Sequence, residues 1–300
     1  MKALLLGARG AVGAVVHREL SRAGHTVTAA GRTTSGDTGV DLRGDLSALT
    51  RLAGRHDVVV NASGIERAGI AAAVHGTPLV DISASGAYLD ALRSAADGPV
   101  VLGAGLVPGL STVLVSALGG RRGDDIDVLV MLGSGERHGP AAVTWTAGLV
   151  GTDVHRPPEG TPVRNLIATR RETGPDGRSR RYLRADFPDH VLLGDSRGLA
   201  VRSYLTLSAA PMTTALAIVG RLPALRGVLG SAPHLGTAAW HLVARNRRTG
   251  ERRQAQGTGQ SEATGRLTAL AASRVTAVAT TGAMTMADLT TPEDAIAALT

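Results

Sequence analysis

The residues best suited to chemistry form a glycine-rich turn near the amino terminus, Gly7-Ala8-Arg9-Gly10-Ala11-Val12-Gly13. The turn follows an apolar run that ends at Leu6 and precedes a helical pattern. A glycine turn between a strand and a helix lets the backbone approach a pyrophosphate and directs the positive end of the helix at its charge. The spacing is Gly-x-x-Gly-x-x-Gly, so a purely structural turn is the alternative. We predict a dinucleotide-binding turn.

Two arginines bear on the choice of nucleotide. The second expected strand ends with Ala29-Ala30-Gly31-Arg32, where an NAD-binding domain usually presents Asp or Glu to the ribose 2′-hydroxyl. Arg32 and Arg9 can instead pair with a 2′-phosphate through their fixed, permanently charged guanidinium groups. Solvated arginines in an arginine-rich chain are the alternative. The sequence therefore predicts NADP as the cofactor.

Residues after the next strands are expected to complete the nucleotide site. Asp41 and Leu42 follow a short expected strand, where they can line the adenine, although Asp41 is equally suited to an ordinary turn. Asn61-Ala62-Ser63-Gly64 closes a buried strand at its carboxyl end, where ligands bind in open α/β sheets. The small side chains of that segment permit close approach to the ribose.

Hydride transfer needs an electrophilic carbon beside the nicotinamide and a proton source or positive charge at the adjacent heteroatom. Tyr88 is the first candidate acid, because the segment from Asp81 to Tyr88 should border the nicotinamide. His155, in a proline-flanked segment, is the second catalytic candidate, with a surface or packed histidine as the alternative. Further titratable candidates are His138, His190 and Tyr204.

An arginine-rich hairpin is expected around Gly174 to Gly177. Its guanidinium groups can grip an acidic substrate by bidentate pairing, and a solvated strand face is the alternative. The arginines are Arg164, Arg170, Arg171, Arg180, Arg181 and Arg184.

Composition excludes several mechanisms. Lys2 is the only lysine, so Schiff-base chemistry, the Walker lysine and the Tyr-x-x-x-Lys pair of short-chain dehydrogenases are absent. The chain has no cysteine and therefore no disulfide, thiolate nucleophile or cysteine-bound metal, which suits a cytoplasmic location. We expect no metal site.

The formal net charge of +7 raises the question of a nucleic-acid partner. Basic residues are scattered and aromatic residues make up only 2% of the chain, so no stacking platform is present. Charged residues interrupt every long apolar stretch before it reaches the length of a membrane span. We expect a small-molecule substrate, no nucleic-acid partner and no membrane partner.

The pattern of elements predicts the fold. Short apolar runs alternate with helical patterns up to about residue 120, which indicates an α/β fold with a doubly wound parallel sheet of the Rossmann type. The later pattern predicts a second, α+β domain, inserted before an alanine-rich helix that returns to the first domain. The expected domains are 1–118 for NADP, 119–260 for the substrate and dimerisation, and 261–300 as a helical segment. The expected strands of the first domain are 2–6, 25–30, 57–61, 79–82 and 100–102, and those of the second begin with 126–132, 163–172, 178–185 and 199–208.

Taken in order, these segments resemble the saccharopine dehydrogenase-like reductases. The resemblance rests on the glycine turn and on the segments Asp57 to Gly64, Gly76 to Ser83 and Gly103 to Leu110. It implies a Rossmann domain, NADP and a cofactor contact at Ser83. Fungal-type saccharopine dehydrogenases use a Lys–His pair, and this chain has no lysine for that role.

We therefore expect an NADPH-dependent oxidoreductase that reduces a C=N or C=O bond of a small metabolite, as a homodimer. An iminium substrate already carries its positive charge, so a site without lysine is chemically reasonable. An enoyl or keto reductase acting on a lipophilic chain is one alternative, which the apolar region from Pro211 to Leu229 suits. A non-catalytic NADP-binding sensor is the other.

Overall fold

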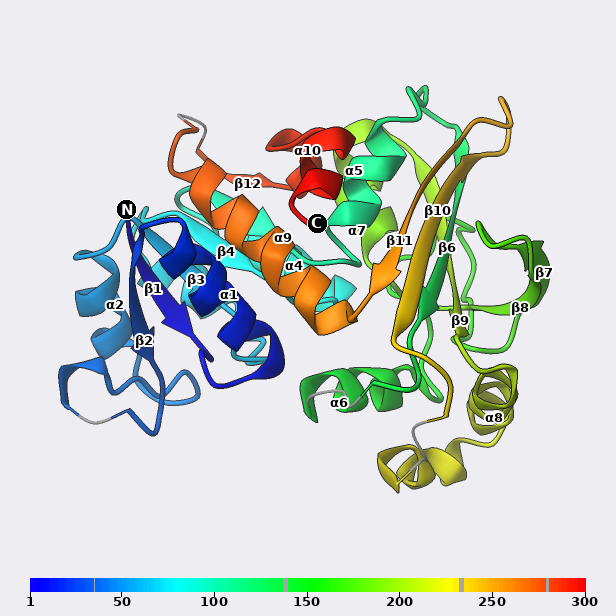
Figure 1. Ribbon diagram of the computed structural model, residues 1–300, viewed down its shortest axis with the longest axis horizontal. Helices are drawn as coiled ribbons and strands as arrows, with labels where there is room; N and C mark the ends of the chain where they lie inside the picture. Colours follow the sequence, from blue (N-terminus) through cyan, green and yellow to red (C-terminus); the bar gives the residue numbers. More distant parts are fainter. Residues whose placement is uncertain (35, 137–139, 232–234, 279–280) are drawn as a thin grey trace. The chain divides into compact units, whose positions relative to one another are not determined.

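The computed structural model describes residues 1–300 except 35, 137–139, 232–234 and 279–280. The chain divides into two compact units. The first unit combines Met1–Val113 with Ser261–Thr300, and the second unit is the continuous segment Leu114–Gln260. Residues from both ends of the chain therefore build the first unit (Figure 1).

The first unit contains a six-stranded parallel sheet in the order β12-β5-β4-β3-β1-β2. Its central strands are nearly continuous apolar runs because helices cover both faces of such a sheet. The strand order reverses beside β1, which makes the carboxyl ends of β1 and β3 the switch point where ligands bind. The strands are β1 (Lys2–Leu6), β2 (Thr26–Ala30), β3 (Val58–Asn61), β4 (Leu79–Asp81), β5 (Val100–Leu102) and β12 (Ala283–Met284).

The helices of the first unit connect these strands. They are α1 (Ala11–Arg22), α2 (Ser47–Ala53), α3 (Gly69–Ala73), α4 (Gly86–Ser94) and α10 (Pro292–Ala297), with 3₁₀ turns η1 (Gly36–Thr38) and η3 (Met286–Asp288). Helix α5 (Leu110–Ser116) spans the boundary with the second unit, and α9 (Gln260–Val275) begins at the other boundary.

Helix α9 packs on α1 and on the end of β5. A β-carbon on Gly265 would lie 2.5 Å from the β-carbon of Val15, so glycine allows the two helices to approach closely. The Thr268 hydroxyl donates a hydrogen bond of 2.7 Å to the carbonyl oxygen of Ala104. Strand β12 then pairs with β5 at the edge of the sheet. The C-terminal segment is thus an integral part of the first unit.

The second unit contains a mixed six-stranded sheet in the order β11-β10-β6-β9-β8-β7. Strands β6 and β9 are parallel, and the other pairs are antiparallel. The strands are β6 (Asp125–Leu132), β7 (Thr169–Thr173), β8 (Ser179–Arg184), β9 (Ala200–Leu207), β10 (Ala239–Asn246) and β11 (Arg252–Thr258). The helical elements are α6 (Pro140–Leu149), α7 (Asp189–Arg197), α8 (Ala210–Arg221) and the 3₁₀ segment η2 (Pro223–Ser231).

The predicted fold class is confirmed, and several details are corrected. The short strand expected before Asp41 is wrong: the described residues there form η1 and one isolated bridge between Gly31 and Gly39. The strand expected from residue 163 begins at Thr169, because Leu166 has a φ of 65° and turns the chain. Helices α6, α7, α8 and α10 were not predicted. No helix in the described part of the chain combines the length and apolar character needed to cross a bilayer.

Candidate nucleotide-binding and active site

The carboxyl ends of the parallel strands place the predicted site residues in one row. Leu6 pairs with Ala30 on one side and with Asn61 on the other, and Asn61 pairs with Asp81. Asp81 in turn pairs with Leu102. Side chains that follow these positions in the chain therefore emerge along one edge of the sheet, which is the ligand-binding edge of an open α/β fold.

The glycine turn is shaped by close backbone approaches. Gly7 has a φ of 85°, and a β-carbon there would lie 2.5 Å from the carbonyl oxygen of Ala62. A β-carbon on Gly13 would lie 2.1 Å from the carbonyl oxygen of Gly7. Both contacts are far closer than real side chains tolerate, so glycine is required at both positions. They draw the turn from Gly7 to Gly13 tightly against the end of β3.

The amino end of α1 has no internal counter-charge. Gly10 precedes the helix without a side-chain cap, and the first turn contains no acidic residue. Gly10 and Ala11 are exposed, whereas Gly13 is buried. The first backbone N–H groups of a helix lack partners within the helix and carry its partial positive charge. The turn thus fits a pyrophosphate.

Arg9 lies against the segment that follows β2. Its guanidinium donates a short hydrogen bond to the hydroxyl of Thr33, next to Arg32. Arg9 and Arg32 are both exposed. The loop is held by Thr34, whose hydroxyl donates to the carbonyl oxygen of Gly31 at 2.7 Å. Arg9 is therefore held beside the segment that carries Arg32 at the end of β2, where dinucleotide-binding domains read the 2′-position of the nucleotide. Thr33 was not singled out in the sequence.

The predicted adenine-lining pair divides into an exposed and a buried residue. Asp41 is exposed, and its carboxylate accepts a hydrogen bond of 3.0 Å from the backbone N–H of Arg43. Leu42 is buried in the core. Arg67 donates to the carbonyl oxygens of Leu42 and Gly44 at 3.2 and 2.6 Å and thereby fixes this loop. Of the predicted pair, Asp41 presents its side chain to solvent.

Asn61 organises the loop after β3. Its amide nitrogen donates to Asp81 at 2.7 Å and to the carbonyl oxygen of Ile65 at 3.2 Å. Its amide oxygen accepts from the Ser63 hydroxyl at 2.6 Å. Asn61 is 1% exposed, and its side chain shapes the loop. Its contact with the cofactor stays a prediction. The predicted neighbours Ala62 and Ser63 are half-buried, and Gly64 is exposed.

Asp81, which was not predicted as a site residue, is the centre of this edge. It is fully buried and accepts hydrogen bonds from Asn61, from the Tyr88 hydroxyl at 2.8 Å and from the backbone N–H of Ser83 at 2.8 Å. Burial raises the pKa of Asp81, although these hydrogen bonds act in the opposite direction. Its place at the end of an expected strand, in the segment expected to border the nicotinamide, was the available signal in the sequence.

Tyr88, the first predicted catalytic residue, lies in the first turns of α4 and is 7% exposed. Burial and the neighbouring Asp81 raise its pKa well above the usual range. Desolvation and the charge of Asp81 also raise the pKa of Glu66. The Tyr88 hydroxyl donates its hydrogen bond to the buried carboxylate of Asp81. Its role as the catalytic acid stays a prediction.

His155, the second predicted catalytic residue, belongs to the second unit. Its backbone N–H donates to Asp186 at 2.9 Å, and its carbonyl oxygen accepts from the ring of His190. The other ring nitrogen of His190 lies 3.0 Å from the carbonyl oxygen of Phe187, so that ring is committed to backbone contacts. His138 lies outside the described residues. The role of His155 stays a prediction.

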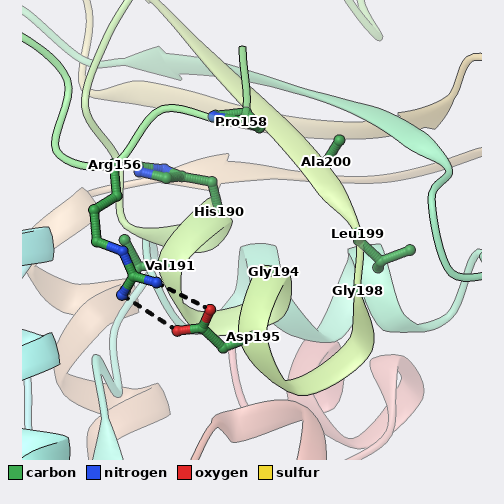
Figure 2. Close-up of a pocket in the computed structure, with 9 residues that line it drawn as sticks. All are labelled: Arg156, Pro158, His190, Val191, Gly194, Asp195, Gly198, Leu199 and Ala200. Carbon is green, nitrogen blue, oxygen red and sulfur yellow. Dashed lines mark hydrogen bonds and ion pairs between the residues drawn. The ribbon is translucent and has the colours of Figure 1, made fainter. Parts of the chain in front are cut away.

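Figure 2 shows a cavity of about 270 Å³ beside α7 in the second unit. Arg156 and Asp195 line it and form an ion pair with an N–O distance of 3.2 Å. Both side chains are about half exposed, and Arg156 has a φ of 47°. Exposed pairs of this kind contribute little stability. No trio of His, Asp and Glu side chains among the described residues could hold a metal ion.

The arginines of the β7–β8 hairpin mostly have carboxylate partners of their own. Arg170 pairs with buried Asp127 at 2.8 Å and also contacts Glu172. Arg184 is 1% exposed and lies 3.3 Å from Glu159. These internal pairs favour a structural role for the two arginines over the capture of an acidic substrate.

Comparison with known proteins shows a relationship in structure alone. No protein-family model matches the chain, and no curated protein matches it. Apo saccharopine dehydrogenase (L-Glu forming) from Saccharomyces cerevisiae matches 99% of this chain and 96% of its own, with a TM-score of 0.54 and 13% identity. The fold of the chain is therefore similar to that of this saccharopine dehydrogenase. The resemblance expected from the sequence is thereby confirmed at the level of the fold.

Two further solved structures are similar over the whole chain. The diaminopimelate (DAP) dehydrogenase of C. glutamicum, in complex with DAP, has a TM-score of 0.47 and 12% identity, with 95% of that chain covered. An engineered D-amino acid dehydrogenase bound to NADP⁺ has a TM-score of 0.43 and 12% identity, with 96% of that chain covered.

Proposed function

We propose that this protein is an NADP(H)-dependent oxidoreductase acting on a C=N or C=O bond of a small metabolite. The observation that carries the proposal is the glycine turn, where β-carbons on Gly7 or Gly13 would collide with the backbone. The tight turn that these glycines permit lies at the uncapped end of α1 and next to Arg9 and Thr33. A dinucleotide with a 2′-phosphate fits that combination of backbone donors and guanidinium groups.

Individual residues can be assigned to parts of the nucleotide. The backbone N–H groups of the glycine turn would hold the pyrophosphate, and Arg9 and Arg32 would hold the 2′-phosphate. Ser63 and Ser83, at the ends of β3 and β4, would border the ribose and nicotinamide. When bound, the nicotinamide supplies or accepts the hydride.

The protein's own residues then position the nucleotide and the substrate and shield them from water. Asp81 holds Asn61 and Tyr88 in place, and these residues shape the loops after β3 and β4. Because the Tyr88 hydroxyl is bound to Asp81, the chemistry that suits this edge is one that needs no strong acid. An iminium carbon already carries the required positive charge, which favours C=N reduction, in keeping with the saccharopine named for the yeast structure.

A second candidate is reduction of a lipophilic enoyl or keto substrate. It is favoured by the exposed apolar side chains of Ile218, Leu222, Leu225 and Val228 in the second unit. A panel of imines, ketones and enones with NADPH, each in a small polar and a long-chain lipophilic form, separates the two candidates, because ketones are common to both and only chain length distinguishes the candidates there.

Nucleotide binding tests the proposal most directly. NADPH and NADH are titrated by fluorescence against the wild type, Arg32→Ala and Arg55→Ala. Arg55 is exposed at the turn before β3, on the opposite edge of the sheet, and its substitution changes the net charge equally. We expect Arg32→Ala to weaken NADPH binding by about tenfold, the value of one charged hydrogen bond, and to leave NADH unchanged. Binding of neither nucleotide by the wild type would overturn the proposal.

A further inference from the structure

An exposed apolar strip runs along the end of α8 and through η2 in the second unit. Ile218, Leu222, Leu225 and Val228 form this strip, with exposed fractions of 49%, 55%, 41% and 57%. All residues from 221 to 228 are exposed. Large apolar side chains gathered in this way mark interaction sites on soluble proteins.

The buried face of α8 is separate from the strip. Thr213, Leu216, Ala217 and Val219 are buried, and α8 contacts β8 and β9. The helix therefore packs against the sheet with one face and exposes Ile218 on another, and the other strip residues follow the helix in the chain. The strip is not needed to complete the core of the second unit.

The charges within α8 and η2 have a single sign. Arg221 and Arg226 are the charged residues within α8 and η2, and the sequence contains no Asp or Glu between Asp195 and Glu251. Arg221 donates to the carbonyl oxygens of Ala217 and Ile167 at 3.1 and 3.3 Å. Arg226 makes no hydrogen bond or ion pair with the described residues. Both arginines thus keep their positive charge beside the strip without a carboxylate.

Helix α6 adds an uncharged segment beside η2. It contacts η2, and Figure 1 draws α6 and α8 at the same end of the second sheet. The segment from Pro140 to Thr152 contains no charged residue. Trp145 of α6 is half-buried, with its ring centroid 4.9 Å from that of Phe187 and the two rings tilted by 39°. A partly exposed tryptophan is well suited to the interface between lipid and water.

We propose that α8 and η2 dock the protein reversibly on an anionic lipid surface, with the strip in the acyl boundary and Arg221 and Arg226 at the headgroups. Interfacial segments bind by inserting an apolar face while basic residues meet anionic headgroups. Charge complementarity selects this occupant, because a second copy of the chain would bring the same two arginines to the interface. The segment lies on the bilayer and spans nothing, and this changes the expectation of no membrane partner.

Vesicle co-sedimentation tests the proposal on the full chain without nucleotide. Vesicles of phosphatidylcholine mixed with phosphatidylglycerol are compared with pure phosphatidylcholine. We expect at least about fivefold tighter binding to the anionic vesicles, since each arginine near such a surface contributes about 1 kcal/mol. The advantage should shrink when salt is raised from about 0.1 M to about 1 M, because the screening length shortens.

Matched variants distinguish vesicle binding through the strip from nonspecific adsorption. Leu222→Glu combined with Val228→Glu should abolish sedimentation, and Arg226→Ala should weaken anionic binding about fivefold. Ile296→Glu adds one such charge, half the change of the double variant, at an apolar residue of the first unit that is 39% exposed, and should bind like the wild type. Thermal melts confirm that each variant is folded.

Three results would overturn the proposal. They are equal binding to both vesicle types, equal loss in Ile296→Glu, and unchanged binding by the double variant. A self-association seen by light scattering that only the double variant abolishes would assign the strip to a second copy instead.

Discussion

Gly13 lies so close to Gly7 that a β-carbon on Gly13 would stand 2.1 Å from the Gly7 carbonyl oxygen. This contact joins the first turn of α1 to the end of β1, and the N–H of Gly10 also donates a hydrogen bond of 3.0 Å to the Gly7 carbonyl oxygen. The nucleotide site proposed here depends on it more than on any single side chain.

Gly13→Ala should therefore abolish binding of NADPH and NADH alike, because the turn must move to admit a methyl group. Gly54→Ala is the matched control: Gly54 has ordinary helical geometry, and its β-carbon would lie 3.8 Å from the nearest atom. Isothermal titration of both variants measures the effect. Retained binding in Gly13→Ala would contradict the role assigned to the turn.

Tyr88→Phe should destabilise the protein by about 1–3 kcal/mol, because buried Asp81 loses one of its donors. Asp81 already has a raised pKa, so the folded state binds its proton more tightly than the unfolded chain does. Losing a donor to the charged form raises that pKa further, and the loss of stability should be larger at about pH 7 than at about pH 4. Urea denaturation at both pH values measures it.

The same variant distinguishes positioning from acid catalysis. With an iminium substrate we expect turnover within about tenfold of the wild type, whereas loss of a general acid costs about 10²–10⁴-fold. A loss in that larger range with unchanged nucleotide affinity would show that Tyr88 is the acid after all.

Asp127→Asn should cost about 3 kcal/mol of unfolding free energy, as expected when one partner of a buried ion pair is removed. The Asp127 side chain is 2% exposed and pairs with Arg170 at 2.8 Å and with Arg247 at 2.6 Å. Asp153→Asn is the control, because Asp153 and Arg164 are both about half exposed. That change should cost less than about 1 kcal/mol. Equal effects in the two variants would refute the structural role of Asp127.

His241 should make the second unit sensitive to mild acid. Its Nε2 lies 2.7 Å from the Tyr182 hydroxyl, and burial lowers its pKa to about 4. Its stabilising contribution is therefore complete above the unfolded pKa of about 6.5 and falls as pH drops toward 4. Between about pH 7 and pH 5 the wild type should lose about 2 kcal/mol more than His241→Gln. Parallel losses in both proteins would exclude this histidine.

The parallel sheet could be predicted from the sequence because each of its main strands is an uninterrupted apolar run. The runs at Leu4–Leu6 and Val58–Val60 are fully buried, and the glycine turn follows the first of them. Helix α6 escaped prediction because its residues are apolar or uncharged on all sides, which gives no helical periodicity. Strand β12 was not predicted because a strand of two residues has no detectable pattern.

The site could be predicted only where its residues are close together in the sequence. The turn from Gly7 to Gly13 is one continuous segment, and its position could be read directly. Asp81, Asn61 and Tyr88 meet because β3 and β4 are adjacent, which is a property of strand order and not of spacing. The sequence offered Tyr88 as an acid, and only the fold revealed the carboxylate that holds its proton.

The pairing of β12 with β5 also determines the order in which the chain can be completed during synthesis. The second unit is continuous and has fully left the ribosome once Gln260 emerges, whereas the first unit still lacks Ser261–Thr300. Until those residues appear, β5 has a free edge and α1 lacks its partner helix, and exposed strand edges invite wrong pairing. The first unit therefore begins synthesis first but completes its fold last. During synthesis it needs protection from wrong pairing for longer than the second unit does.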